Sequence, residues 1–132
     1  KKEIQMVRDY ADIEQMRLSK EQILDLRCEE EHIQQYRIAP LLLIPFVENA
    51  VKHGLNSMAD GAYVFMEIKV SDHTLRFSCK NNYKPLPPRE ESGLGLENVR
   101  KRLQLLYPGK HTLDIKQQND TFEVLLSIQL SL

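Results

Sequence analysis

Four polar side chains with chemical potential lie on one largely apolar stretch, residues 40–55. Glu48 and Lys52 are four positions apart, as are Asn49 and His53. On an α-helix, residues at this spacing are neighbours one turn apart, so the four side chains form one polar stripe. An alternative is that the stripe is only the solvent-facing edge of an otherwise buried helix. A second segment that supplies a ligand would favour the functional interpretation.

A glycine-rich segment, residues 92–98 with the sequence SGLGLEN, could supply that ligand. Gly93 and Gly95 let the backbone approach a ligand closely, and free N–H groups at the start of a helix favour phosphate. The alternative is a plain hinge or helix cap. No strand lies directly upstream, as a Rossmann fingerprint requires, and no Gly-Lys-Ser/Thr follows, as in a P-loop. Both of those nucleotide-binding folds are disfavoured.

Three helices are expected to position these residues. Apolar residues recur at three- and four-residue steps over residues 4–18, which predicts an amphipathic helix. Residues 41–53 predict a buried helix with Pro40 in its first turn and Gly54 at its end. A third helical pattern opens at residues 93–96 and ends at residues 107–109.

Five alternating segments predict strands. The first is residues 23–28, and two hairpins follow, formed by residues 62–70 with 74–81 and by residues 112–117 with 121–130. Residues 82–92 contain three prolines and predict a loop without regular structure. One mostly antiparallel mixed sheet with three helices packed on one face, an α/β two-layer sandwich, is the simplest assembly of these elements.

Composition limits the classes of function. The 132 residues predict a single domain, and 18 basic against 19 acidic residues leave a net charge of -1, which argues against nucleic acid as a partner. No apolar run is long enough for a membrane span or a signal peptide. Cys28 and Cys79 have no metal-binding spacing and predict free thiols in a reducing compartment. Because the chain opens on Lys1 within a helix-like pattern, we expect a fragment of a longer protein.

Two segments together carry a resemblance to a known family. The run PLLLIPFVENAVKHGL at residues 40–55 and the run SGLGLENVRKRLQLLYP at residues 92–108 resemble the ATP-binding domain of LytS/YehU-type sensor histidine kinases. This domain has the Bergerat (GHKL) fold, shared with gyrase, Hsp90 and MutL. The N-terminal helix agrees, since Tyr10, Ile13, Glu14 and Arg17 match the Tyr-x-x-Ile-Glu-x-x-Arg sequence that precedes the family's first strand.

The resemblance implies roles for the polar stripe. Asn49 matches the N-box asparagine, which coordinates the Mg²⁺ that bridges the ATP phosphates, and a neutral oxygen ligand suits that ion. Glu48 resembles the acidic N-box residue that polarises the incoming nucleophile or orients magnesium-bound water. Lys52 and His53 match the basic pair that meets the phosphates. Glu48 and Asn49 are therefore the implied catalytic residues.

The glycine-rich segment matches the family's G2 box at the hinge of the ATP lid. The resemblance implies that Gly93, Leu94, Gly95 and Leu96 contact ATP, with backbone amides that meet the phosphates. Asn98 and Arg102 lie one turn apart on the helix that follows, and this face flanks the nucleotide in the family. Arg100 and Lys101 predict an ordinary solvated basic face.

The sequence departs from the family at the segment before the lid. The family has Asp-x-Gly-x-Gly there, and its aspartate accepts a hydrogen bond from the adenine amino group. Asn81 takes the aspartate position, followed by Asn82 in the same ATP-binding segment, while Tyr83 and Pro85 replace the glycines. Because an amide oxygen accepts without the charge of a carboxylate, adenine binding is expected to be weaker by about 1–2 kcal/mol.

The implied function is phosphoryl transfer from Mg-ATP to a histidine in two-component signalling. The single domain, residues 1–132, would follow a dimerisation segment that carries the acceptor histidine, since His32, His73 and His111 lie in or beside strand and turn patterns. The implied partners are that upstream helix and a response regulator, in a homodimeric parent anchored in the inner membrane with this domain in the cytoplasm. The alternative is an ATP-sensing or protein-interaction module of the same fold without kinase activity.

Overall fold

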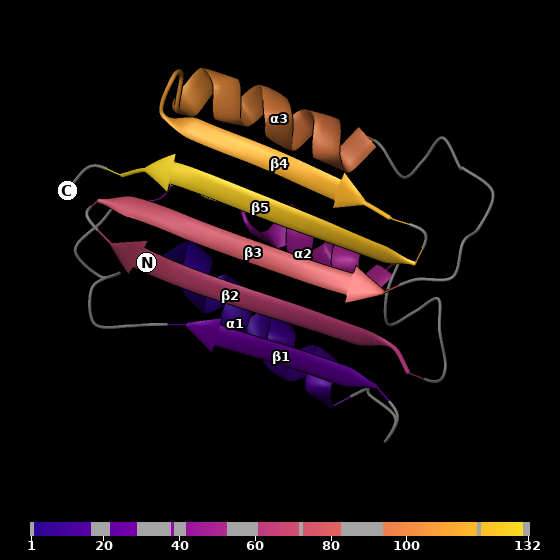
Figure 1. Cartoon of the computed structure of the whole chain (residues 1–132). Helices are drawn as coiled ribbons and strands as arrows, with labels where there is room; N and C mark the ends of the chain where they lie inside the picture. Colours follow the sequence, from indigo (N-terminus) through magenta and orange to yellow (C-terminus); the bar gives the residue numbers. More distant parts are fainter. Residues whose placement is uncertain are drawn as a thin grey trace.

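Strands form one layer and helices the other in the computed structural model, which describes residues 2–16, 22–28, 38, 42–52, 61–71, 73–82, 94–118 and 120–130. Within these residues there are three helices and five strands (Figure 1). Their bounds are α1 Lys2–Gln15, β1 Ile23–Cys28, α2 Ile44–Ala50, β2 Tyr63–Ser71, β3 Thr74–Asn82, α3 Leu94–Leu106, β4 His111–Gln117 and β5 Thr121–Gln129.

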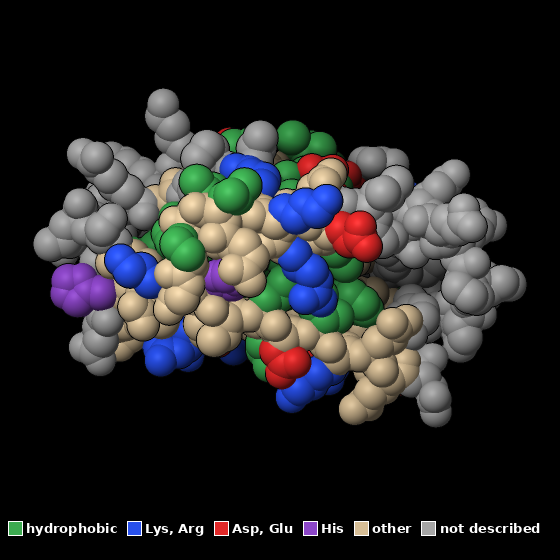
Figure 2. Space-filling view, turned by 90° about the horizontal axis from the view of Figure 1, so that it is seen from above, with side chains coloured by type: hydrophobic (Ala, Val, Ile, Leu, Met, Phe, Trp, Pro, Cys, Tyr) green, Lys and Arg blue, Asp and Glu red, His purple; other side chains and the backbone are tan. Residues whose placement is uncertain are grey.

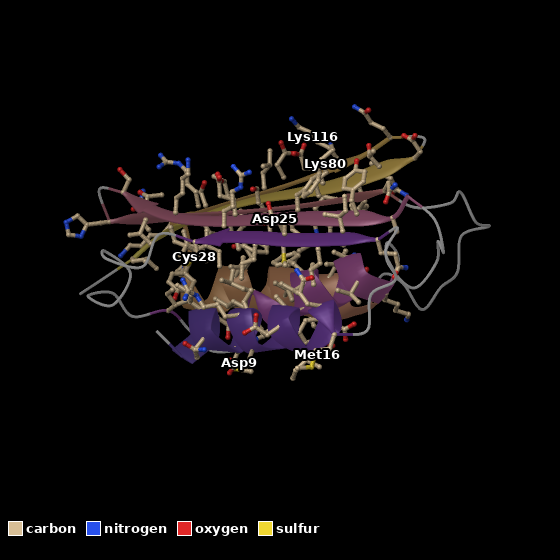
Figure 3. The ribbon with its side chains drawn as sticks, turned by 90° about the horizontal axis from the view of Figure 1, so that it is seen from below. Asp9, Met16, Asp25, Cys28, Lys80 and Lys116 are labelled. Carbon is tan, nitrogen blue, oxygen red and sulfur yellow. The ribbon has the colours of Figure 1, made fainter. Side chains whose placement is uncertain are left out.

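The described strands form one sheet in the order β1-β2-β3-β5-β4. β1 pairs with β2 in parallel, and the other neighbouring strands pair antiparallel. All three described helices lie on the same side of this sheet (Figure 3). The predicted α/β two-layer sandwich with a mostly antiparallel mixed sheet is therefore confirmed.

The two faces of the sheet have different chemistry because side chains alternate along each strand. Asp25, Lys80 and Lys116 point away from the helices (Figure 3). The opposite side chains of β2, β3 and β5 are buried against the helices, and the apolar ones are Val64, Met66, Ile68, Val70, Leu75, Phe77, Cys79, Val124, Leu126 and Ile128. The helices contribute Ile4, Val7, Ala11, Ile44, Phe46, Val47, Ala50, Val99 and Leu103 to the same core.

α2 begins later than the sequence predicts. A start at residue 41 with Pro40 in the first turn is wrong, because Leu42 and Leu43 form a bend and the first helical residue is Ile44. The reason is Pro45, which has no N–H and is tolerated only in a first turn. A helix from residue 41 would place this ring in its interior. Beyond Ala50 the chain widens into a π-helical turn at Val51 and Lys52, and residues 53 and 54 lie outside the described part.

The other boundaries agree with the prediction within a few residues. α1 starts two residues earlier than expected, and residues 17–21 lie outside the described part. β1 coincides with the predicted strand, and both hairpins form. His73 has a φ of 63° in the turn between β2 and β3, and Gly109 has a φ of 68° after α3, as reversals of the chain require. No helix in the described ranges is long and apolar enough to cross a membrane.

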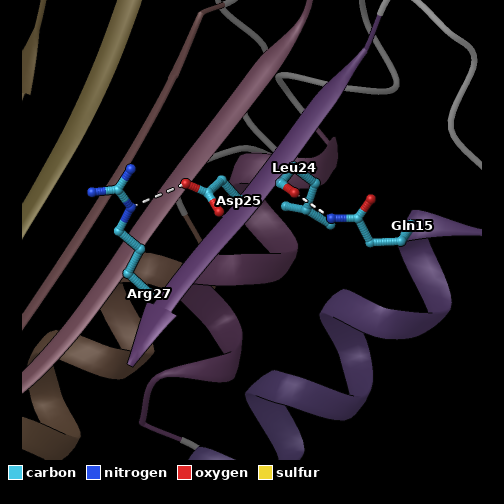
Figure 4. A network of polar contacts seen from close by, with 4 residues as sticks. All are labelled: Gln15, Leu24, Asp25 and Arg27. Atoms are coloured by element: carbon cyan, nitrogen blue, oxygen red, sulfur yellow. Dashed lines mark hydrogen bonds and ion pairs between the residues drawn. The ribbon is translucent and has the colours of Figure 1, made fainter. Parts of the chain in front are cut away.

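α1 is attached to the edge of the sheet. The Gln15 side-chain amide donates a hydrogen bond to the Leu24 carbonyl in β1 (Figure 4). Because the Ile23 N–H bonds to the Ala62 carbonyl beside β2, the Leu24 carbonyl faces the free edge. Gln15 therefore covers part of this edge of the described sheet. The Arg27–Asp25 pair on β1 is exposed at 3.4 Å and contributes little.

Both cysteines are free, as predicted, and Cys79 provides a test of the core. Its thiol is 2% exposed, and burial raises its pKa from 9.0 to about 12. The unfolded chain therefore loses this proton at a lower pH than the folded chain. The stability that Cys79 contributes is present below pH 9 and is lost as the pH rises toward 12.

We expect Cys79→Ala to flatten the alkaline loss of stability. Between pH 9 and 10.5 the free energy of unfolding of the wild type should fall more steeply than that of Cys79→Ala, by up to about 1.4 kcal/mol per pH unit. Urea titrations at several pH values measure both slopes, and Cys28→Ala at the half-buried thiol is the matched control. Equal slopes for wild type and Cys79→Ala would contradict the assignment.

Candidate functional site

Three of the four residues of the predicted polar stripe lie in the described part of the chain, on α2 and the turn that follows it. Ile44, Phe46, Val47 and Ala50 are buried, whereas Glu48 and Lys52 are exposed and Asn49 is half-buried. The sheet side of the helix is thus apolar, and the polar side chains gather toward its C-terminal end. His53 lies outside the described residues, so its predicted place in the stripe stays a prediction.

Aromatic packing sets α2 over the centre of the sheet. The rings of Phe46 and Phe77 lie 6.1 Å apart at an angle of 38°. Phe77 belongs to the buried row of β3, which continues through Cys79 to Asn81 at the C-terminal end of the strand. The C-terminal end of α2, the end of β3 and the start of α3 all lie at the same end of the sheet (Figure 1).

Asn81 ends the buried row of β3, on the side of the sheet that carries the helices. It is 1% exposed, and its Nδ2 donates a hydrogen bond to the Asn82 carbonyl at 3.0 Å. Its Oδ1 accepts no hydrogen bond from the residues that the structure describes. Asn81 therefore keeps an acceptor that a ligand amino group could use.

Asn82 faces the opposite side of the sheet and is engaged by the backbone. Its Oδ1 accepts from the Tyr63 N–H at 2.9 Å, and its Nδ2 donates to the Gly61 carbonyl at 2.8 Å. These bonds join the end of β3 to the start of β2. The two neighbouring asparagines thus differ in what they can do: Asn82 holds the strands together, and Asn81 is available to a ligand.

The start of α3 carries the glycine-rich segment. As predicted, the helix opens within residues 93–96: α3 begins at Leu94 and Gly95 is its second residue, while Gly93 lies outside the described part. In the first turn, no preceding turn of the helix offers an acceptor to the Gly95 N–H. That N–H is therefore one of the free donors of the helix start.

The helix face beyond Gly95 has mixed exposure. Leu96 and Arg102 are half-buried, and Asn98 is exposed. Arg100 and Lys101 are exposed, as predicted for a solvated face. In the view from above, where α3 and β4 are nearest the viewer, basic side chains lie among hydrophobic ones (Figure 2). A shallow hollow of about 410 Å³ there is lined by Arg100, Lys101, Gln104 and Leu105, none of which is a predicted nucleotide-binding residue.

The polar groups at this end of the sheet suit a nucleotide that brings its own Mg²⁺ ion. Across the described ranges no group of three His, Cys, Asp or Glu side chains comes together to hold a metal ion. A magnesium ion that keeps its waters and takes phosphate oxygens needs few protein ligands, and one half-buried amide such as Asn49 fits that requirement.

A buried carboxylate, Glu3, is a residue that the sequence pattern does not single out. It lies in the first turn of α1, is 2% exposed, and accepts hydrogen bonds from backbone N–H groups at the start of α2. Its partners lie 40 and 41 positions away along the chain, so no local spacing in the sequence predicts the contact.

Sequence relatives of the chain are sensor histidine kinases. BtsS of Escherichia coli K12 is 27% identical over 123 residues, which cover 91% of this chain and 21% of BtsS. YpdA of Escherichia coli K12 is 29% identical over 117 residues, 81% of this chain and 20% of YpdA. The chain thus spans about a fifth of the length of the curated relatives it matches. No protein-family model matches it.

Solved structures with the same fold include parts of histidine kinases. The nucleotide-free catalytic domain of ThkA superposes with a TM-score of 0.64 at 16% identity, over 95% of this chain and 90% of that domain. The cytoplasmic segment of QseC gives 0.59 at 17% identity, over 97% of this chain and 76% of that segment. The chain therefore has the α/β sandwich of histidine kinase catalytic domains. Together with the sequence relatives, this confirms the resemblance to sensor histidine kinases.

Proposed function

We propose that the chain is the ATP-binding catalytic domain of a two-component sensor histidine kinase, which transfers a phosphoryl group from Mg-ATP to a histidine outside residues 1–132. One observation carries the proposal. The C-terminal end of α2, the end of β3 that carries Asn81 and the start of α3 lie at one end of the sheet. Mg-ATP requires a ligand for its metal ion, an acceptor for the adenine amino group and donors for its phosphates.

The phosphates would lie between α2 and the start of α3. N–H groups in the first turn of α3, including that of Gly95, donate to phosphate oxygens, and the helix dipole favours their negative charge. The phosphate contact of Gly93 stays a prediction from the sequence. Asn49 offers a neutral oxygen to Mg²⁺, and Lys52, with His53 beside it in sequence, offers positive charge to the phosphates. A bound Mg²⁺ supplies charge neutralisation during phosphoryl transfer.

Glu48 is exposed, so a nucleophile from another segment can reach it. Its carboxylate accepts a hydrogen bond from the N–H of the incoming imidazole, which orients the opposite ring nitrogen toward the phosphoryl group. Most of the rate enhancement then comes from positioning and from stabilisation of charge, as is usual for phosphoryl transfer. Leu96, Asn98 and Arg102 on α3 flank the nucleotide in this arrangement.

The response regulator and the upstream dimerisation helix are proposed partners. A structure of ThkA in complex with the response regulator TrrA contains a domain of the same fold, with a TM-score of 0.59. The chain covers 40% of that ThkA chain, so the partners engage a larger protein. We extend the same organisation to this protein, as a homodimer anchored in the inner membrane with this domain in the cytoplasm.

We expect Asn49→Ala to weaken Mg-ATP binding by roughly tenfold or more and to remove its dependence on magnesium, because the amide is the proposed metal ligand. Calorimetric titrations with ATP, in the presence of Mg²⁺ and of EDTA, measure both effects. Gln104→Ala, at an exposed position of α3, is the matched control. An unchanged magnesium requirement would count against the role of Asn49, and no heat with folded wild type at millimolar ATP would refute nucleotide binding.

We expect Asn81→Asp to strengthen ADP binding by about 5- to 30-fold, because a carboxylate accepts the adenine amino group with charge assistance. Titration with ADP, and with GDP for base selectivity, measures the change. Gln104→Glu is the control, since it makes the same amide-to-carboxylate change at an exposed position of α3. Weaker or unchanged ADP binding in Asn81→Asp would contradict the adenine contact.

An ATP-sensing module without kinase activity is the alternative, favoured by the replacement of the family's aspartate with Asn81. Phosphohistidine formation on a longer protein that includes the upstream helix separates the two functions. We expect radiolabel from γ-labelled ATP to appear on a histidine upstream of this domain and to be lost in Glu48→Gln, while ATP binding is retained. ATP binding without any phosphohistidine would favour the sensing module.

A further inference from the structure

Glu3 occupies a position where a carboxylate is costly unless it is hydrogen-bonded. It is 2% exposed on the inner face of α1, among residues of the hydrophobic core. Its Oε2 accepts hydrogen bonds from the Leu43 N–H at 2.5 Å and from the Ile44 N–H at 3.2 Å. The Glu3 carboxylate on α1 thus binds backbone N–H groups at the start of α2.

These bonds complete the first turn of α2. The first N–H groups of a helix have no partner within it, and a polar side chain just before the helix usually accepts them. Here that position is Leu43, which has no such side chain. Pro45 has no N–H, and the Phe46 N–H donates to the Leu43 carbonyl at 3.1 Å. The remaining N–H groups, on Leu43 and Ile44, donate their hydrogen bonds to Glu3.

The contact also determines where α2 lies. α2 has seven residues and is too short to persist without tertiary contacts. Apolar packing, such as Phe46 on Phe77, holds the helix against the sheet but is non-directional. Hydrogen bonds are directional, and two donors on one oxygen restrict sliding and rotation of the helix start. Asn49 lies five residues beyond Ile44, so a shift of the start moves the proposed metal ligand as well.

We propose that Glu3 is a positioning residue for the nucleotide site: from α1 it sets the position of α2 and therefore of Glu48, Asn49 and Lys52. This proposal rests on the proposed nucleotide-binding function of those three residues. α1 is itself attached to β1 through Gln15 at its other end. α1 thus acts as a brace between the edge of the sheet and the start of the helix that carries the site.

The test compares Glu3→Ala and Glu3→Gln with Val7→Ala, which removes a fully buried apolar side chain from the same helix. ADP with Mg²⁺ is titrated at a temperature at which each variant is folded, and urea titration measures stability. We expect Glu3→Ala to raise the Kd about tenfold, since small displacements of site groups are costly. Val7→Ala should lose stability but stay within about twofold in Kd, and Glu3→Gln, which keeps an oxygen acceptor, should stay within about threefold.

A Kd for Glu3→Ala equal to that of Val7→Ala would overturn the proposal and leave Glu3 a purely structural role. If Glu3→Ala does not fold, Glu3→Asp replaces it, since the shorter side chain keeps the charge but withdraws the acceptor. Backbone amide NMR shifts decide the matter without nucleotide. We expect shifts of Val47 and Asn49 in the Glu3 variant but not in Val7→Ala, and shifts confined to Leu43 and Ile44 would refute positioning. Failure of wild type to bind ADP would refute only the proposed function.

Discussion

The rest of the structure depends on one constraint: the short helix α2 must be buried to be stable. A seven-residue helix gains too little from its own hydrogen bonds to persist in water, so burial must hold it. Phe46 and Val47 are almost fully buried, and Phe46 packs on Phe77 of β3. Because every side but one is buried, the polar residues of the helix have a single direction available to them. Because the other sides are buried, the polar residues of α2 are confined to one stripe.

The same buried row of β3 that supports α2 also places Asn81. Side chains alternate along a strand, so a slip of one residue would exchange Asn81 for Asn82 on the helix-covered face. Asn82 opposes such a slip, because its amide bonds to both Gly61 and Tyr63 at the start of β2. The two adjacent asparagines thus have different roles: the bonds of Asn82 fix the register, and this register keeps Asn81 on the helix-covered face.

Local patterns predicted most of the fold because most of its elements are defined locally. Alternation located the strands within a residue or two, and a 3.6-residue period located α1 and α3. The start of α2 was misplaced because the apolar run continues through Leu42 and Leu43, and only Pro45 marks the true start. The stripe on α2 followed from spacing. The hydrogen bonds that Glu3 accepts could not be predicted, since they join residues 40 and 41 positions apart and depend on how two helices pack.

Near-neutral charge determines how such a domain can attract a nucleotide. With a net charge of -1 the chain as a whole offers an anion no long-range attraction. On the proposed function, the attraction is local and comes from the dipole of the thirteen-residue helix α3, from the Lys52 ammonium and from a Mg²⁺ ion that Asn49 would hold. Each of these acts over a few ångströms, so their effect depends on placement. On the proposed function, affinity therefore depends on how accurately α1 and β3 hold α2 in place.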